Sequence, residues 1–170
     1  MKKIILFIIV LFNFNHANAE INIAYIDINY ILSNSVVGKS ITKHIDSIKQ
    51  KKTKEFESIE SKLSEKEKDL LAKKNILEKN EFSKEVEILR NEATLYTDDK
   101  KKFIKNINEK KIEYTKLVLN SLNNIIADYV ESNSITVVFS KKNIVVAKKN
   151  LDITDSIMKL LNDNLTKIDF

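Results

Sequence analysis

The chain has 170 residues, a size that fits a single domain, and a formal net charge of +5. It contains no cysteine and no proline, and Gly38 is its only glycine, which excludes disulfide bonds and leaves almost every position compatible with a helix. Lysine outnumbers arginine by 28 to 1, so side chains that bind phosphate or guanine through paired hydrogen bonds are nearly absent.

The first nineteen residues follow the order of a secretory signal peptide. Two lysines precede an unbroken apolar run from Ile4 to Phe12, and the small residues Ala17 and Ala19 follow it. The run is shorter than the about 20 apolar residues that cross a bilayer. A buried N-terminal strand or helix is the alternative. We expect cleavage after Ala19 and export of the mature chain.

Three short features follow the predicted signal peptide: a strand, a helical turn and a glycine. Residues 21–27 are β-branched and partly alternating, which predicts a strand, and residues 28–34 predict a short helical turn. We interpret Asp27 as a structural acid near an assembly interface rather than as a functional site. We interpret Gly38 as permitting the turn into a long helical region, the alternative being a functional backbone contact.

From residue 41 to residue 129 the apolar residues step by threes and fours, a heptad-like pattern that predicts coiled-coil helices. The predicted seam consists of Ile41, Ile45, Ile48, Phe56, Ile59, Leu63, Leu70, Leu77, Phe82, Val86, Leu89, Ala93, Tyr96, Phe103, Ile107, Tyr114, Leu117, Ile125 and Tyr129. Lys52 and Lys66 occupy two positions where the pattern expects apolar residues. We expect these interruptions to splay the helices and to favour a cavity-forming arm over a tight rod.

One helix of this length would have nothing in its own chain to pack against, so we expect a reversal. Residues 78–81 interrupt the apolar stepping, and Asn80 can cap a second helix. The prediction is a hairpin of two helices of roughly 40 and 50 residues, with its tip near 78–83, that projects about 60 Å.

The period changes after residue 132. Residues 134–140 and 144–147 predict two strands joined by a turn at 141–143, and therefore a β-hairpin. Thr154 is predicted to cap a last helix, with Asp155 in its positive first turn. Asp152 and Asp155 could pair as carboxylates, but helix capping explains both.

No catalytic constellation is evident. His44 is the only histidine after the predicted leader, and no cysteine can join it as a metal ligand or as a catalytic partner. We therefore expect neither an enzyme nor a cofactor or metal site.

Two stretches carry a family resemblance. One comprises Ile23 to Asp27, Leu32, Ser35, Gly38 and Lys39, and the other Leu151 to Asp155, Ile157, Lys159, Leu161 and Asn162. Both stretches, and the order of the predicted elements, resemble the Skp/OmpH family of periplasmic chaperones. The arm matches only in its pattern. The resemblance implies a homotrimer in which strands of three chains form a small barrel. Three helical hairpins then enclose a cavity that holds unfolded outer-membrane proteins without ATP.

The expected fold is therefore mainly α with a small β part: a long antiparallel coiled-coil hairpin on a β association domain formed by strands of several chains. The boundaries are 1–19 for the signal peptide, 20–38 and 133–170 for the association domain, and 39–132 for the arm. Each chain has too few strands to form a stable sheet by itself. A sheet that combines strands of several chains is therefore favoured. The predicted association residues are Ile23, Tyr25, Ile26, Val137, Phe139, Val145, Ile157 and Leu161.

Client contact is predicted at the tip, where Phe82 follows the break in the seam and is flanked by Lys79 and Lys84. The other aromatic residues of the arm are better explained by seam packing. Residues 39–116 carry 21 basic and 16 acidic residues, whereas the rest of the mature chain carries 6 and 8. The lysine clusters at 49–54 and 100–102 have two explanations. They are helix faces exposed to solvent, or they attract anionic clients or an anionic membrane surface.

Two other classes of function remain open. A structural coiled-coil spacer of the cell envelope would have a closed seam and would not bind unfolded polypeptide. A nucleic-acid binder is disfavoured by the signal peptide and by the lack of arginine, so we expect no specific nucleic-acid partner.

Overall fold

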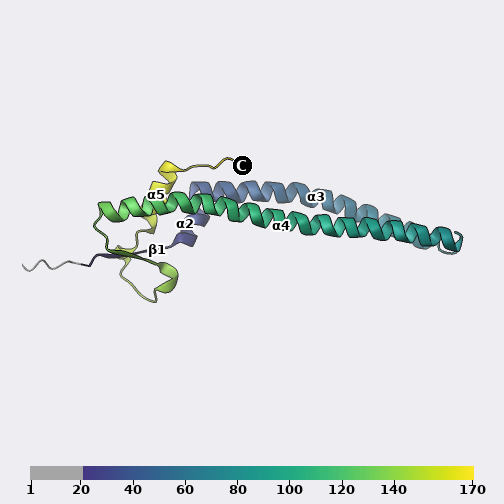
Figure 1. Ribbon diagram of the computed structural model, residues 1–170, viewed down its shortest axis with the longest axis horizontal. Coiled ribbons are helices and arrows are strands. Elements are labelled where there is room, and N and C mark those ends of the chain that lie inside the picture. The colour runs from purple at the N-terminus through teal and green to yellow at the C-terminus, as the bar shows by residue number, and fades with distance from the viewer. Residues whose placement is uncertain (1–20) are drawn as a thin grey trace, which may run out of the picture.

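The computed structural model describes residues 21–170, so the predicted signal peptide and its cleavage site at Ala17 and Ala19 lie outside the described residues. Two long helices, α3 (Val36–Ala72) and α4 (Lys79–Ser132), lie side by side as an arm that projects from a small base (Figure 1). The base contains β1 (Ile23–Ile26), α2 (Ile28–Asn34), β2 (Val137–Ser140) and α5 (Thr154–Asn164). The predicted mainly helical fold, with a hairpin arm and a small sheet, is confirmed.

The first described residues form the predicted strand and helical turn, β1 and α2. Asp27 ends the strand and caps α2, because its Oδ1 accepts a hydrogen bond of 2.9 Å from the backbone N–H of Tyr30. Ser35, which is fully buried, caps α3 in the same way and accepts from the backbone N–H of Gly38. Two side-chain caps thus turn the chain from β1 into the arm.

Gly38 has a different role from the predicted one. It lies in the first turn of α3, not at a junction, and it is buried against α2. A Cβ atom at this position would clash with the backbone carbonyl group of Leu32. Gly38 is therefore required because α2 and α3 approach each other closely.

The reversal at the tip lies slightly earlier than predicted. Helix α3 ends at Ala72, residues 73–78 form the turn, and α4 begins at Lys79 (Figure 1). Glu78 precedes α4 without a capping side-chain hydrogen bond, and Asn80 lies inside the helix. The turn closes through backbone bonds alone, such as that from Leu77 N–H to the carbonyl oxygen of Lys73, which the sequence pattern does not reveal.

The predicted β-hairpin at 134–147 is wrong. Strand β2 pairs in parallel with β1, with Ile23 opposite Val137 and Ile26 opposite Ser140. The chain then turns through a short 3₁₀ helix, Lys141–Asn143, and residues 144–147 form no strand. The other edge of β1 is occupied by the segment before α5, where the N–H of Ile153 donates to the carbonyl oxygen of Tyr25 at 3.0 Å. The first strand is thus central, with later segments on both sides.

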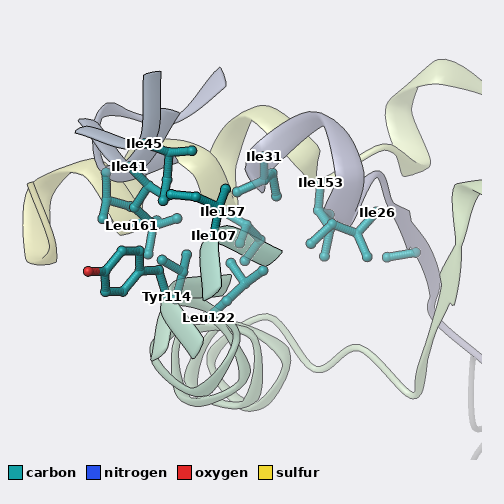
Figure 2. Packing of buried hydrophobic residues seen from close by; sticks show 13 residues of the cluster. Ile26, Ile31, Ile41, Ile45, Ile107, Tyr114, Leu122, Ile153, Ile157 and Leu161 are labelled. Carbon is teal, nitrogen blue, oxygen red and sulfur yellow. The ribbon is translucent and has the colours of Figure 1, made fainter. Parts of the chain in front are cut away.

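The hydrophobic core lies where the root of the arm meets α5 (Figure 2). It joins residues from α2, α3, α4 and α5, among them Ile31, Val37, Ile41, Ile45, Ile107, Tyr114, Val118, Leu122, Ile157 and Leu161. The predicted seam placed Leu117 here, but Leu117 is 45% exposed, whereas Val118 and Leu122 are fully buried. From Tyr114 onward the buried residues of α4 recur at every fourth position, because the apolar face of this helix is directed toward α5 as well as toward α3.

Replacing Gly38 by alanine should lower the free energy of unfolding by about 1–3 kcal/mol, the usual cost of overpacking, even though alanine favours helix by up to about 1 kcal/mol. The added methyl group must push the α2 backbone away from α3. Urea denaturation followed by circular dichroism measures this, with Lys39→Ala at the exposed neighbouring position as the control. A Gly38→Ala protein as stable as the wild type contradicts the close-approach explanation.

Candidate functional site

The two stretches that carry the family resemblance meet in the base. The backbone N–H of Asp27 donates to the Thr154 hydroxyl oxygen at 2.9 Å, and the backbone N–H of Val36 donates to Oδ1 of Asn162 at 2.8 Å. Each bond joins residues more than 120 positions apart in the chain. These two bonds join the two stretches in the base from which the arm projects, although Val36 itself is not one of the resembling residues.

Asp152 is the ionised centre of this junction. Its Oδ1 accepts from both the hydroxyl and the backbone N–H of Thr154, and its Oδ2 lies 3.3 Å from Nζ of Lys141. Burial acts to raise the pKa of Asp152, but the hydrogen bonds from Thr154 and Lys141 outweigh it and hold that pKa below the ordinary value. Thr154 does not cap α5 as predicted. Asp152 satisfies the N–H of Thr154 instead, and Asp155 lies exposed in the first turn as predicted.

The lysines that interrupt the predicted seam do not splay the helices. Nζ of Lys52 lies 3.1 Å from a carboxylate oxygen of Asp99, and Nζ of Lys66 lies 2.6 Å from one of Glu92. Each pair connects α3 to α4. The hydrogen bonds that Lys52 donates to Asp99 and to Glu55 raise the pKa of Lys52, which favours its charged ammonium group. The prediction overlooked that acids on α4 stand opposite these lysines.

Aromatic packing closes the middle of the arm. Phe56 is buried, and its ring meets those of Tyr96 and Phe103 edge to face, with centroids 5.8 and 5.7 Å apart. Nζ of Lys52 lies 4.9 Å from the centre of the Phe56 ring. These three aromatic residues lie in the seam, as their spacing indicates.

The tip differs from the prediction in which apolar residue it exposes. Phe82 is half-buried against the hairpin, whereas Ile76 in the turn is 80% exposed and Leu71 is 61% exposed. Lys79 and Lys84 are exposed as expected. Ile76 was missed because it stands outside the heptad pattern, in a segment that closes as a turn.

Further exposed aliphatic side chains lie along the arm itself. They are Ile59, Ile88, Leu95, Ile104 and Ile112, with exposed fractions from 37% to 70%. Ile59 was predicted to lie in the seam but is 37% exposed, and the other four lie outside the predicted seam. The hairpin of one chain leaves all five partly uncovered.

The predicted association residues divide into two groups. Tyr25, Ile26, Ile157 and Leu161 are buried within the chain. Ile23, Phe139 and Val145 are exposed, and Val137 is half-buried. Only the second group is available to another chain without disruption of the base.

His44 stacks on the ring of Phe170 at a centroid distance of 3.9 Å and meets Tyr114 edge to face. Its role in the described part of the chain is aromatic packing. Over residues 21–170, no three His, Cys, Asp or Glu side chains are grouped as metal ligands. Among the helices of the same residues, none combines the length and the apolar character needed to cross a membrane.

Comparison with known proteins identifies the family. A family model described as outer membrane protein (OmpH-like) matches residues 22–161. The chain belongs to the OmpH-like family. The fold is also similar to the crystal structure of a proposed outer membrane chaperone (OmpH-like) from Caulobacter crescentus. The TM-score is 0.80 and the identity 19%, over 88% of each chain. No curated protein sequence matches this OmpH-like chain.

The junction at Asp152 predicts a pH-dependent contribution to stability. A carboxyl group whose pKa is lowered by folding stabilises the fold above its unfolded pKa, near 3.8, and loses that contribution as the pH falls through its folded value. Asp152→Asn should therefore cost about 1.5–3 kcal/mol at pH 7, the range for hydrogen bonds to charged groups. The difference from wild type should shrink as the pH falls below about 4.

Urea denaturation at a series of pH values measures this difference. Asp155→Asn, at an exposed position in the first turn of α5 three residues further along the chain, is the matched control and should cost less than about 1 kcal/mol. An Asp152→Asn difference that stays constant down to pH 2 contradicts the role of the charged junction.

Proposed function

We propose that the chain is an ATP-independent periplasmic holdase, which binds unfolded outer-membrane proteins and prevents their aggregation. The observation that carries the proposal is the aliphatic surface that the arm of this OmpH-like chain exposes. Ile76, Leu95 and Ile112 are 80%, 70% and 69% exposed. Exposed apolar side chains of this kind bind the apolar side chains of unfolded polypeptides with little sequence specificity.

The proposed assembly is a homotrimer whose arms surround the client. A sheet of two strands is marginal on its own, and within the described residues no strand pairs with the outer edge of β2. Ile23 and Phe139 on the strands are exposed, and the β-branched residues Val145 and Val146 are 103% and 87% exposed. Pairing these segments between chains would bury them and complete the sheet.

The charge of the arm suits a role in capture. The excess of basic over acidic residues in 39–116 attracts anionic clients, and also an anionic membrane surface, at a distance. At the tip, Lys79 and Lys84 flank the half-buried Phe82 in the sequence, and Ile76 precedes them in the turn. We propose all four as client contacts. Such attraction raises the rate of capture more than the final affinity.

The compartment follows from the predicted signal peptide. Cleavage after Ala19 would deliver the mature chain to the periplasm, where no ATP is present. A holdase that works by reversible surface contact needs none.

The second candidate is a structural coiled-coil spacer of the envelope. The pairs Lys52–Asp99 and Lys66–Glu92 favour it, because each links α3 to α4 at a position where the seam was predicted to open. A spacer would not retain unfolded polypeptide.

Suppression of aggregation distinguishes the two functions. The mature protein, added in trimer equivalents to a β-barrel protein diluted from urea, should keep light scattering low without nucleotide. The double variant Ile76→Ser/Ile112→Ser should suppress several-fold less, because the contact surface becomes polar. Ser61→Ala/Ser64→Ala on the same arm is the control. Full aggregation in the presence of the folded wild-type protein contradicts the holdase and leaves the spacer.

A further inference from the structure

One side of the arm is grooved between α3 and α4. Near the tip the groove has a volume of about 370 Å³, and a neighbouring stretch of about 400 Å³ continues toward the middle of the arm. Lys66 and Glu92 line both stretches. On α4 the groove extends from Glu81 to Asp99, which is about 27 Å at 1.5 Å per residue. An extended segment of about eight residues has that length.

The groove has an aliphatic surface. Leu63, Leu70, Leu77 and Leu89 are half-buried in its floor. Ile59, Ile88 and Leu95 line it as well, and they are 37%, 52% and 70% exposed. The floor therefore offers contact to aliphatic side chains that enter from solvent.

The rim of the groove near the tip is acidic, although the arm as a whole is basic. Four carboxylates line this stretch, those of Asp69, Glu81, Glu85 and Glu92, against the two ammonium groups of Lys66 and Lys73. Lys66 is bonded to Glu92. Three carboxylates then remain against one ammonium group, so the local charge is opposite to that of the arm.

We propose that this groove binds an extended segment of an unfolded client in which aliphatic side chains alternate with lysine or arginine. The aliphatic side chains contact the floor, and the cationic groups meet Asp69, Glu81 and Glu85 at the rim. An anionic segment is repelled at the same place. This inference rests on the proposed holdase function and names the class of client segment that one part of the arm selects.

Two fluorescent peptides of nine residues test the proposal. Both carry leucine at alternate positions, and the others are lysine in one peptide and glutamate in the second. Binding to the full mature protein is measured by fluorescence anisotropy at low salt. The lysine peptide should bind about five- to tenfold more tightly, the effect of two or three exposed ion pairs. The preference should decline as salt rises, because screening weakens these pairs.

Variants locate the binding to the groove. Glu81→Gln/Glu85→Gln should remove most of the preference for the lysine peptide, whereas Glu65→Gln/Glu67→Gln, exposed on α3 outside the groove, should keep it. Ile88→Ser/Leu95→Ser should weaken the binding of both peptides. Circular dichroism checks that each variant is folded.

Three outcomes overturn the groove proposal: equal binding of the two peptides, tighter binding of the glutamate peptide, or equal loss of preference in the two pairs of Glu→Gln variants. If the protein still suppresses aggregation in these cases, the holdase function stands and only the groove proposal fails. If the peptides bind as expected but aggregation is not suppressed, the groove recognises peptides and the holdase function fails.

Discussion

A hairpin of two long helices buries only a narrow seam, and this seam contains lysines at two positions that face the partner helix. The arm therefore depends on the core at its root, where α3 and α4 are fixed by segments from both ends of the chain. The side chains of Val37, Val118, Leu122, Ile157 and Leu161 are fully buried there. Helices α5 and α2 pack on the same root. The directions in which α3 and α4 leave the base are therefore fixed, and these directions determine where the tip lies.

The distribution of burial along the arm follows from this dependence. Beyond Phe56 and Ile107, no residue of the two arm helices toward the tip is as fully buried as those at the root, within the described part of the chain. The tip half is held by half-buried leucines and by ion pairs such as Lys66–Glu92, which are exposed and contribute little each. The arm is tightly packed at its root and less tightly packed toward its tip. It can therefore expose aliphatic side chains to solvent near the tip and remain folded.

The sequence predicted the arm well because helical periodicity is a local property that repeats over ninety residues. It also predicted β1, α2 and α5. It failed for the partner of β2, because residues 137–140 pair with a strand more than 110 positions earlier, and no local pattern encodes that pairing. A hairpin with 144–147 was the local alternative, and those residues form no strand in the part of the chain that the structure describes.

The site was predicted less well, for similar reasons. Exposure at the tip depends on where the turn closes, and a shift of a few residues moved it from Phe82 to Ile76. Lys52 and Lys66 looked like defects in the seam, because the acids opposite them are 47 and 26 positions away in the chain. The clash at Gly38 involves a backbone carbonyl group, which no residue pattern reports.

Hydrogen exchange of the isolated protein, followed by mass spectrometry, tests the dependence of the arm on its root most directly. The account predicts a gradient along both long helices, with the slowest exchange in β1, α5 and residues 107–122 and the fastest helical exchange in residues 66–92. Uniform protection along α3 and α4, or slower exchange at the tip than at the root, would contradict it.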